Sequence, residues 1–389
     1  MSEIKTKSSR SKDYLWVFLF IIIFINGFEA GGYQASLYTI GQIYDLSITK
    51  MGIFASVELL ATMLAPLLLG HVADRVDKIK FILVFLGIQT IFSSVVFIGN
   101  SELLFVIGIF FLGLTTSTLQ FVSIAALTDA YPQTGAKKIG SMTSMYALGA
   151  FVAPLFVNFY LTRGISWKTL FISLAIASVL AFCGTMLSRN YCKEVSQKTE
   201  SSESTQTQFI LLGVLLLCVV MCIYVGYENG FAFFVDTLFT DTLKSSSGKF
   251  ALSIFWAIMI PSRILVSYLS KYTKKMLLFS VIAIPVITVM ISMMTNVSAV
   301  IALIIPLGLC CGAIYPCVLT TLLSFSGNKK ATATAMITVS TGVGGVVFTA
   351  LTGIMADSFG MRNAMICLAA FFILTILAVV ILYRKYFKE

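Results

Sequence analysis

Long apolar runs separated by short polar breaks dominate this chain. Most of the runs are at least as long as the roughly 20 apolar residues that an α-helix needs to cross the hydrocarbon core of a bilayer. They are continuous and lack the polar–apolar alternation of membrane-barrel strands, so we expect helices. The twelve predicted spans are 14–43, 50–72, 79–99, 103–128, 139–162, 167–188, 209–240, 249–270, 275–296, 298–326, 330–357 and 362–383.

The composition agrees with this pattern. Of the 389 residues, 58% are hydrophobic and only 11% are charged, and the mean hydropathy is +0.95. These values lie far outside those of soluble globular domains. We therefore expect an all-α polytopic membrane protein, with too little polar sequence outside the spans to form a soluble enzyme domain.

The placement of positive charge predicts the topology. With the N-terminus in the cytoplasm, the tails and loops on that side carry 20 of the 27 Lys and Arg residues, and the opposite side carries 6. This asymmetry is the one found in inner loops of membrane proteins. The net charge of +10 therefore indicates orientation in a cell membrane, with both termini cytoplasmic, rather than binding of nucleic acid.

The longest polar stretch, 189–208, is rich in Ser, Thr, Gln and Glu and predicts a flexible cytoplasmic linker. It divides the spans into six and six. The expected organisation is a cytoplasmic tail at 1–13, a six-helix bundle at 14–188, the linker at 189–208, a second six-helix bundle at 209–383, and a cytoplasmic tail at 384–389.

A short internal repeat opens both halves. The segments INGFEAGGY, at 25–33, and VGYENGFAF, at 225–233, share the pattern glycine–aromatic–glutamate–x–glycine. Both segments lie in spans that cross the membrane in the same direction. The pattern predicts a parallel repeat of two six-helix bundles, as in transporters whose halves are related by an axis along the membrane normal.

The loop GHVADRVDKIK, at 70–80, resembles the signature of the major facilitator superfamily between its second and third helices. Gly70, Asp74, Arg75, Lys78 and Lys80 match that signature, and Asp77 replaces its second glycine. The resemblance implies a charge network of Asp74 with the basic residues that holds the cytoplasmic face closed. The alternative is that these basic residues only anchor the loop on the cytoplasmic side.

Four later segments are similar to the fucose–proton symporter family and its relatives. They are SIAALTDAYP, YALGAFVAPL, GLCCGAIYP and GVGGVVFTALTGIMADSFG. The resemblance implies the major facilitator fold, alternating access, proton coupling through an acid in the first helix, and a sugar-like solute. The family often has an asparagine near the position where this chain has Ser123. This difference bears on sugar recognition.

Few charged residues lie inside the spans: Glu29, Glu58, Glu228 and Arg263. A charge at the bilayer centre costs roughly 2.5–3.5 kcal/mol on insertion scales, so such residues usually face protein or a water-filled cavity. A carboxyl group removed from water favours its protonated form. Glu29, together with Glu228, is therefore a candidate for proton coupling; the alternative is a structural acid held by hydrogen bonds or a salt bridge.

Other side chains in the spans are candidates for the solute cavity. Helical spacing places them on polar or aromatic faces: Asn26, Tyr33, Gln120, Ser123, Tyr224, Phe231 and Tyr315. Glu58 is a candidate gate or cavity residue. Arg263 either extends its head group to the cytoplasmic surface or pairs with a membrane acid.

These features favour a secondary active transporter of a small organic solute, sugar-like by resemblance, coupled to protons. A proton-coupled exporter of drugs or lipophilic cations is the alternative, because acids and aromatic rings bind cations. A membrane sensor without transport is a third. The chain has no ATP-binding loop of the GxxxxGK[ST] type and has one histidine. We therefore expect no catalytic residues, no metal and no cofactor. We also expect the protein to be a monomer.

Overall fold

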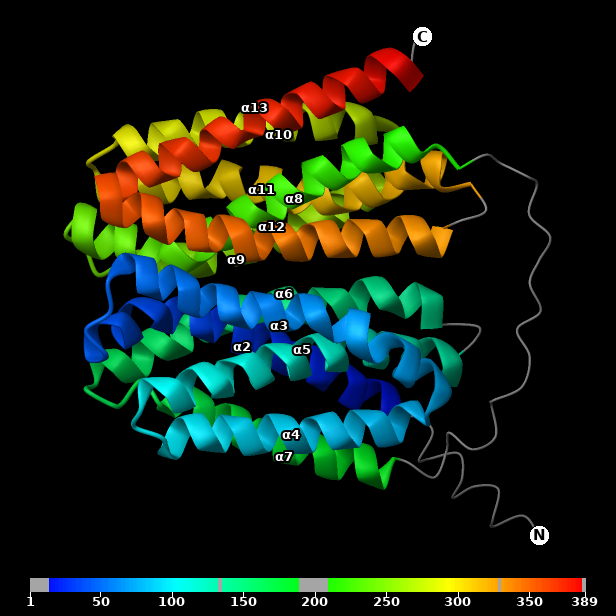
Figure 1. Cartoon of the computed structure of the whole chain (residues 1–389), viewed down its shortest axis with the longest axis vertical. Coiled ribbons are helices and arrows are strands. Elements are labelled where there is room, and N and C mark those ends of the chain that lie inside the picture. Colours follow the sequence, from blue (N-terminus) through cyan, green and yellow to red (C-terminus); the bar gives the residue numbers. More distant parts are fainter. Residues whose placement is uncertain (1–13, 132–134, 189–208, 328–329, 387–389) are drawn as a thin grey trace. The chain divides into compact units, whose positions relative to one another are not determined.

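A computed structural model describes residues 14–131, 135–188, 209–327 and 330–386. In these ranges, twelve helices are long and apolar enough to cross a membrane, and no strand occurs (Figure 1). The predicted tail at 1–13 and the predicted linker at 189–208 lie outside the described residues. The expected all-α membrane fold is confirmed.

Each predicted span coincides with a helix, and the ends differ by a few residues. The helices are α2 (Leu15–Ile43), α3 (Ile48–Arg75), α4 (Lys78–Ile98), α5 (Glu102–Ala130), α6 (Gly135–Thr162), α7 (Thr169–Leu187), α8 (Leu211–Thr237), α9 (Gly248–Tyr268), α10 (Thr273–Met293), α11 (Val297–Ser326), α12 (Lys330–Phe359) and α13 (Met361–Tyr386). A π-helical turn, η2 (Leu238–Thr242), extends α8, and a 3₁₀ turn, η3 (Ser270–Tyr272), precedes α10. Because α13 runs to Tyr386, the first residues of the predicted tail at 384–389 are helical.

Short polar side chains begin several helices. Ser101 accepts a hydrogen bond from the backbone N–H of Leu104 at the start of α5, and Asn296 does the same for Ala299 at the start of α11. Asp77 accepts from Ile79 and Lys80 at the start of α4. Such caps satisfy backbone donors that have no partner inside the helix.

The chain forms two compact units. Among the described residues, unit 1 contains 14–33, 61–131 and 135–188, and unit 2 contains 34–60, 209–327 and 330–386. Besides the linker, the division therefore falls within α2 and α3, and the segment 34–60 belongs with the C-terminal helices.

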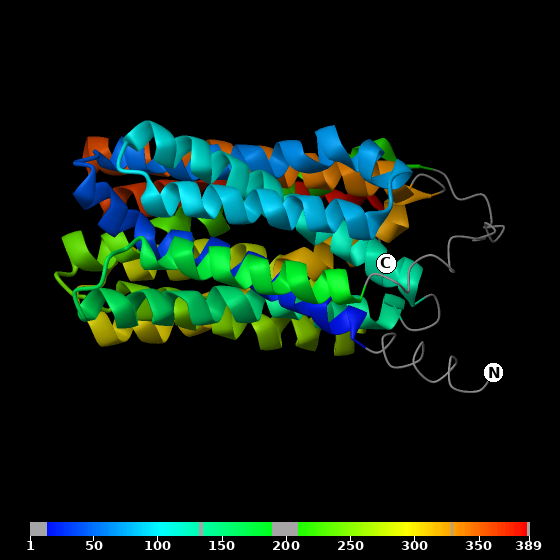
Figure 2. The same cartoon turned by 90° about the horizontal axis from the view of Figure 1, so that it is seen from below.

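Within unit 1, α4 packs against α5 and α7, and α5 against α6; Figure 2 shows α4 and α5 (light blue and cyan) side by side. Within unit 2, α8 packs against α12 and α13, α9 against α11, and α10 against α11 and α13.

Both units contain helix crossings in which glycine allows backbones to touch, and one from each unit lies near a glutamate of the repeat. In unit 1, a Cβ at Gly27 of α2 would overlap the carbonyl of Tyr146 in α6. In unit 2, a Cβ at Gly344 of α12 would overlap the carbonyl of Cys222 in α8. Small residues allow this close approach between membrane helices. Glu29 on α2 and Glu228 on α8 each lie within two helical turns of one of these contacts.

Replacing Gly344 by alanine should destabilise the protein. The new methyl group must displace backbone rather than a flexible side chain, and overpacking of this kind costs about 1–3 kcal/mol. Gly87→Ala is the matched control, because a Cβ at Gly87 meets nothing within 4 Å and alanine favours helix by about 1 kcal/mol. Thermal unfolding of the purified variants should show a lower midpoint for Gly344→Ala only; equal midpoints would contradict the close-contact interpretation.

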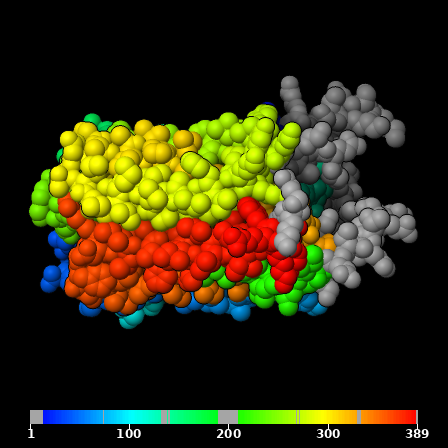
Figure 3. Space-filling view, turned by 90° about the horizontal axis from the view of Figure 1, so that it is seen from above, coloured from blue at the N-terminus to red at the C-terminus, as the bar shows by residue number. Residues whose placement is uncertain are grey.

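The outer faces of the helices are apolar. Figure 3 shows α10 (yellow) and α13 (red) side by side on one face of unit 2. Large apolar side chains are exposed there: Phe279, Ile282, Val286, Met290, Ile373, Leu374, Leu377 and Ile381. An apolar surface of this extent on neighbouring helices suits contact with lipid rather than water.

Candidate functional site

Glu29 lies at the centre of a buried polar cluster in unit 1. Its side chain is fully buried in α2, and the hydroxyl of Thr116 in α5 donates a hydrogen bond to its Oε2 over 3.2 Å. No Lys, Arg or His side chain among the described residues forms an ion pair with it. Its second oxygen, Oε1, is buried and accepts no hydrogen bond from the described part of the chain. Among the described residues, the partner of the carboxyl group is therefore the neutral hydroxyl of Thr116.

Asn26, one turn before Glu29, joins the same cluster. Its side-chain amide donates to the backbone carbonyl of Thr116 over 3.0 Å, so one residue of α5 contacts both polar residues of α2. The side-chain oxygen of Asn26 is buried and has no hydrogen-bond partner within the described ranges. The polar faces expected on the first and fourth spans thus meet at Thr116.

Three further predicted cavity residues lie in unit 1. Ser123, two turns after Thr116 on α5, is fully buried, and its hydroxyl has no hydrogen-bond partner in the described residues. Gln120 lies between them and is half-buried. Tyr33 is fully buried, and its ring lies 6.1 Å from that of Phe105. The α5 side of the cluster is therefore lined by hydroxyl and amide groups without formal charge.

Glu228 has a different environment, in unit 2. It pairs with Arg263 of α9, whose Nη2 lies 3.9 Å from Oε1 of Glu228. This contact corresponds to the second alternative for Arg263, a pair with a membrane acid. The repeat therefore conserves the position of the glutamate in α2 and α8 but not its partner, a hydroxyl for Glu29 and a guanidinium for Glu228.

The aromatic residues predicted for the cavity in unit 2 separate into two groups. Tyr224 is fully buried one turn before Glu228 on α8, and Tyr315 lies on α11, which packs against both α8 and α9. Phe231 instead packs in the core, with its ring centre 6.1 Å from that of Tyr227 and 5.0 Å from that of Phe255. Only the tyrosines accompany the charged pair.

Glu58, the remaining charged residue expected inside a span, is 3% exposed in the part of α3 that belongs to unit 2. That part is attached to α12. The hydroxyl of Ser56 donates to the carbonyl of Val346 over 2.9 Å, and the hydroxyl of Thr49 donates to Asp357 over 2.8 Å.

Two buried polar pairs in unit 2 were not anticipated. The indole N–H of Trp256 donates to the side-chain oxygen of Gln34 over 3.0 Å, and both residues are almost fully buried. Lys249 pairs with Asp236 at 2.6 Å, with side chains only 13% and 2% exposed. The sequence shows Asp236 near a span end and Trp256 within a span. It does not show their partners, because these lie on other helices.

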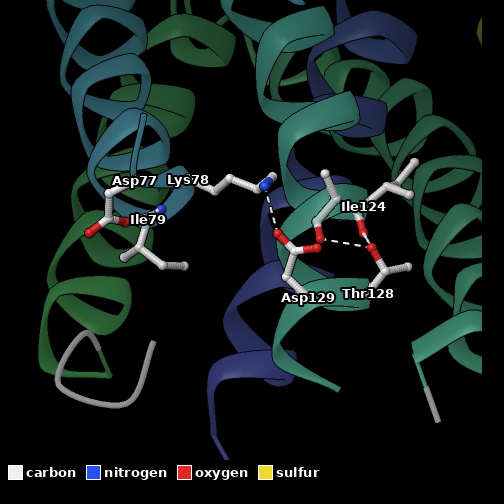
Figure 4. Close-up of polar contacts among 7 residues, drawn as sticks. Asp77, Lys78, Ile79, Ile124, Thr128 and Asp129 are labelled. Carbon is white, nitrogen blue, oxygen red and sulfur yellow. Dashed lines mark hydrogen bonds and ion pairs between the residues drawn. The ribbon is translucent and has the colours of Figure 1, made fainter. Parts of the chain in front are cut away.

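The loop that resembles the superfamily signature forms a contact between α4 and α5. Lys78 pairs with Asp129 at 2.6 Å, and Asp77, in place of the usual glycine, caps α4 (Figure 4). Arg75 is exposed at the end of α3, and a Cβ at Gly70 would meet open space. The side chain of Asp74 is not among those that the structure describes. The pair is largely exposed on the Asp129 side, so its net contribution to stability is about 0–1 kcal/mol.

Metal-binding groups are not part of this arrangement. In the described residues, no group of three or more His, Cys, Asp or Glu side chains could hold a metal ion. The chemistry available in the two clusters is hydrogen bonding, ion pairing and proton binding.

The family model of the Major Facilitator Superfamily matches residues 19–335 and 216–389, which together span nearly the whole chain. The chain belongs to the Major Facilitator Superfamily. Its members are transporters rather than enzymes, so the buried acids of α2 and α8 lie in a transport protein. The expectations of family, fold and absence of an enzyme class are confirmed.

Relatives within the superfamily are distant in sequence. The glucose/mannose transporter GlcP of Bacillus subtilis (strain 168) is 21% identical over 305 residues, which cover 75% of this chain and 74% of GlcP. Among solved structures, an inward-facing, unoccupied bacterial homologue of the human lysosomal transporter Spinster has a TM-score of 0.78 at 14% identity, covering 97% of this chain and 98% of that one. The nucleoside transporter NupG has a TM-score of 0.70 at 15% identity, covering 96% and 99%. These structural similarities show the major facilitator fold.

Proposed function

We propose that this superfamily member is a secondary active transporter that works by alternating access and couples the movement of a small polar organic solute, sugar-like, to protons. Glu29 is the first candidate for the proton carrier and Glu228 the second. The protein acts as a monomer in the cell membrane, with both termini in the cytoplasm.

The observation that carries proton coupling is the neutral environment of Glu29. An ionised carboxylate without a cationic partner is costly in a low-dielectric interior, and binding a proton removes the charge. The hydroxyl of Thr116 can donate to the carboxylate and can also accept from the protonated acid. The cluster can therefore hold Glu29 in both protonation states, as a proton carrier requires.

The polar solute is supported by the lining of the same cluster. Asn26, Gln120 and Ser123 offer donors and acceptors without net charge, and Asn26 and Ser123 have buried polar atoms with no hydrogen-bond partner among the described residues. Hydroxyl groups of a sugar match this mixture of donors and acceptors. The distant relative GlcP is a glucose/mannose transporter, which favours the sugar-like class over lipophilic cations.

Transport by purified protein in liposomes tests this proposal. With an acidic exterior, labelled D-glucose or D-mannose should accumulate above its equilibrium level, and a protonophore should abolish the accumulation. Accumulation that is unaffected by the protonophore would contradict proton coupling. Efflux of a cationic dye without sugar flux would support the exporter, and absence of flux for sugars, nucleosides, amino acids and dyes would support a sensor.

A further inference from the structure

The ion pair of Glu228 and Arg263 is loose. The 3.9 Å between Nη2 and Oε1 exceeds the roughly 2.7–2.9 Å of a direct charge-assisted hydrogen bond. Oε1 of Glu228 is buried and accepts no hydrogen bond from the described residues. The two groups neutralise each other's charge, but Glu228 retains capacity to accept a hydrogen bond.

The arginine of this pair is partly accessible, whereas Glu29 is fully buried. The side chain of Arg263 is 31% exposed and that of Glu228 11%, and Tyr315 beside them is 42% exposed. A guanidinium group facing hydrocarbon is expensive, so its accessible part has to face water or a polar solute. A polar solute that contacts the exposed part of Arg263 lies next to the pair.

Three helices of unit 2 contribute to this group: α8 with Tyr224 and Glu228, α9 with Arg263, and α11 with Tyr315. These three helices pack against one another. The guanidinium only donates hydrogen bonds, the carboxylate only accepts them, and the tyrosine hydroxyls do both. A hydroxyl group, which also donates and accepts, is the complementary function on a solute.

The net charge of the pair determines which solutes it admits. Because the opposite charges of Glu228 and Arg263 largely cancel, a charged solute gains no net counter-charge for the water that it loses, whereas a neutral solute needs none. Aromatic surroundings add apolar faces for a sugar ring. An exporter of lipophilic cations would require an acid without the guanidinium.

We infer that Glu228 and Arg263 together form a recognition site for uncharged polyhydroxy solutes, and that their mutual neutralisation excludes charged analogues of the same solute. The inference rests on the proposed function and names its substrate class. It assigns Glu228 to solute recognition and leaves proton coupling to Glu29.

Charge-selective competition tests the inference. The wild-type protein and variants in liposomes exchange labelled D-glucose, and competition by D-glucosamine, a cation at about pH 6.5, and by D-glucuronate, an anion, is measured. Glu228→Gln leaves the charge of Arg263 unbalanced and should improve competition by glucuronate relative to glucose by about tenfold. Arg263→Gln should improve competition by glucosamine in the same way.

Matched variants separate recognition from damage to the fold. Glu228→Gln with Arg263→Gln should remove both preferences, Arg263→Lys should keep the neutral preference, and Arg384→Gln, an exposed arginine at the end of α13, should change nothing. Where Arg263→Gln fails to fold, Glu228→Gln alone decides. If the variants exchange glucose but show no opposite changes in competition by glucuronate and glucosamine, the inference alone is overturned. If the wild-type protein exchanges no sugar, the proposed sugar transport is overturned as well.

Discussion

Replacing Glu29 by glutamine is expected to abolish proton-driven accumulation of the solute while preserving its exchange across the membrane. Glutamine has the shape of protonated glutamate but cannot release a proton, and the hydroxyl of Thr116 can still donate to its amide oxygen. The variant should bring labelled sugar only to equilibrium under a pH gradient, and counterflow exchange should stay near the wild-type rate. Uptake into liposomes, with and without the gradient, measures both quantities.

Two variants serve as comparisons for Glu29→Gln. Glu102→Gln removes an acid that is exposed at the start of α5, and it should accumulate solute normally. Glu228→Gln should change which solutes compete, and the uptake that it retains should still be driven by the pH gradient. Continued concentrative uptake by Glu29→Gln would exclude this residue as the proton carrier.

Replacing Lys249 by methionine is expected to cause a large loss of stability. Asp236 is 2% exposed in α8 and has Lys249 as its ionic partner at 2.6 Å, while its Oδ1 has no hydrogen-bond partner in the described residues. Removing one member of a buried ion pair leaves an uncompensated charge, which costs about 3–5 kcal/mol. The midpoint of thermal unfolding of the purified protein should fall accordingly.

A double variant distinguishes the buried charge from lost packing. Lys249→Met combined with Asp236→Asn removes both charges, so it should recover most of the lost stability. Lys271→Met, which removes an exposed lysine after α9, should leave the midpoint unchanged. If the double variant is as unstable as Lys249→Met, the loss comes from packing around Gly248 and Asp236 rather than from the unpaired charge.

Several properties of this protein follow from sequence alone. The helices and their lengths depend on local apolar runs, because a segment of about 20 apolar residues crosses a bilayer whatever surrounds it. The loop at 70–80 resembles the superfamily signature. The glutamates of the repeat stand out as candidate functional residues, because charges inside a span are costly. The face of α2 that carries Asn26 and Glu29 follows from helical spacing.

Only the tertiary structure decided which side chains meet across helices. The glutamates of the repeat differ in their partners: Thr116 for Glu29 and Arg263 for Glu228. The grouping of residues 34–60 with unit 2 and the pair of Asp236 with Lys249 were equally hidden. The physical reason is that apolar composition determines that a helix crosses the membrane, whereas its neighbours and its rotation depend on close packing, and membrane helices associate through small residues and polar contacts at particular positions.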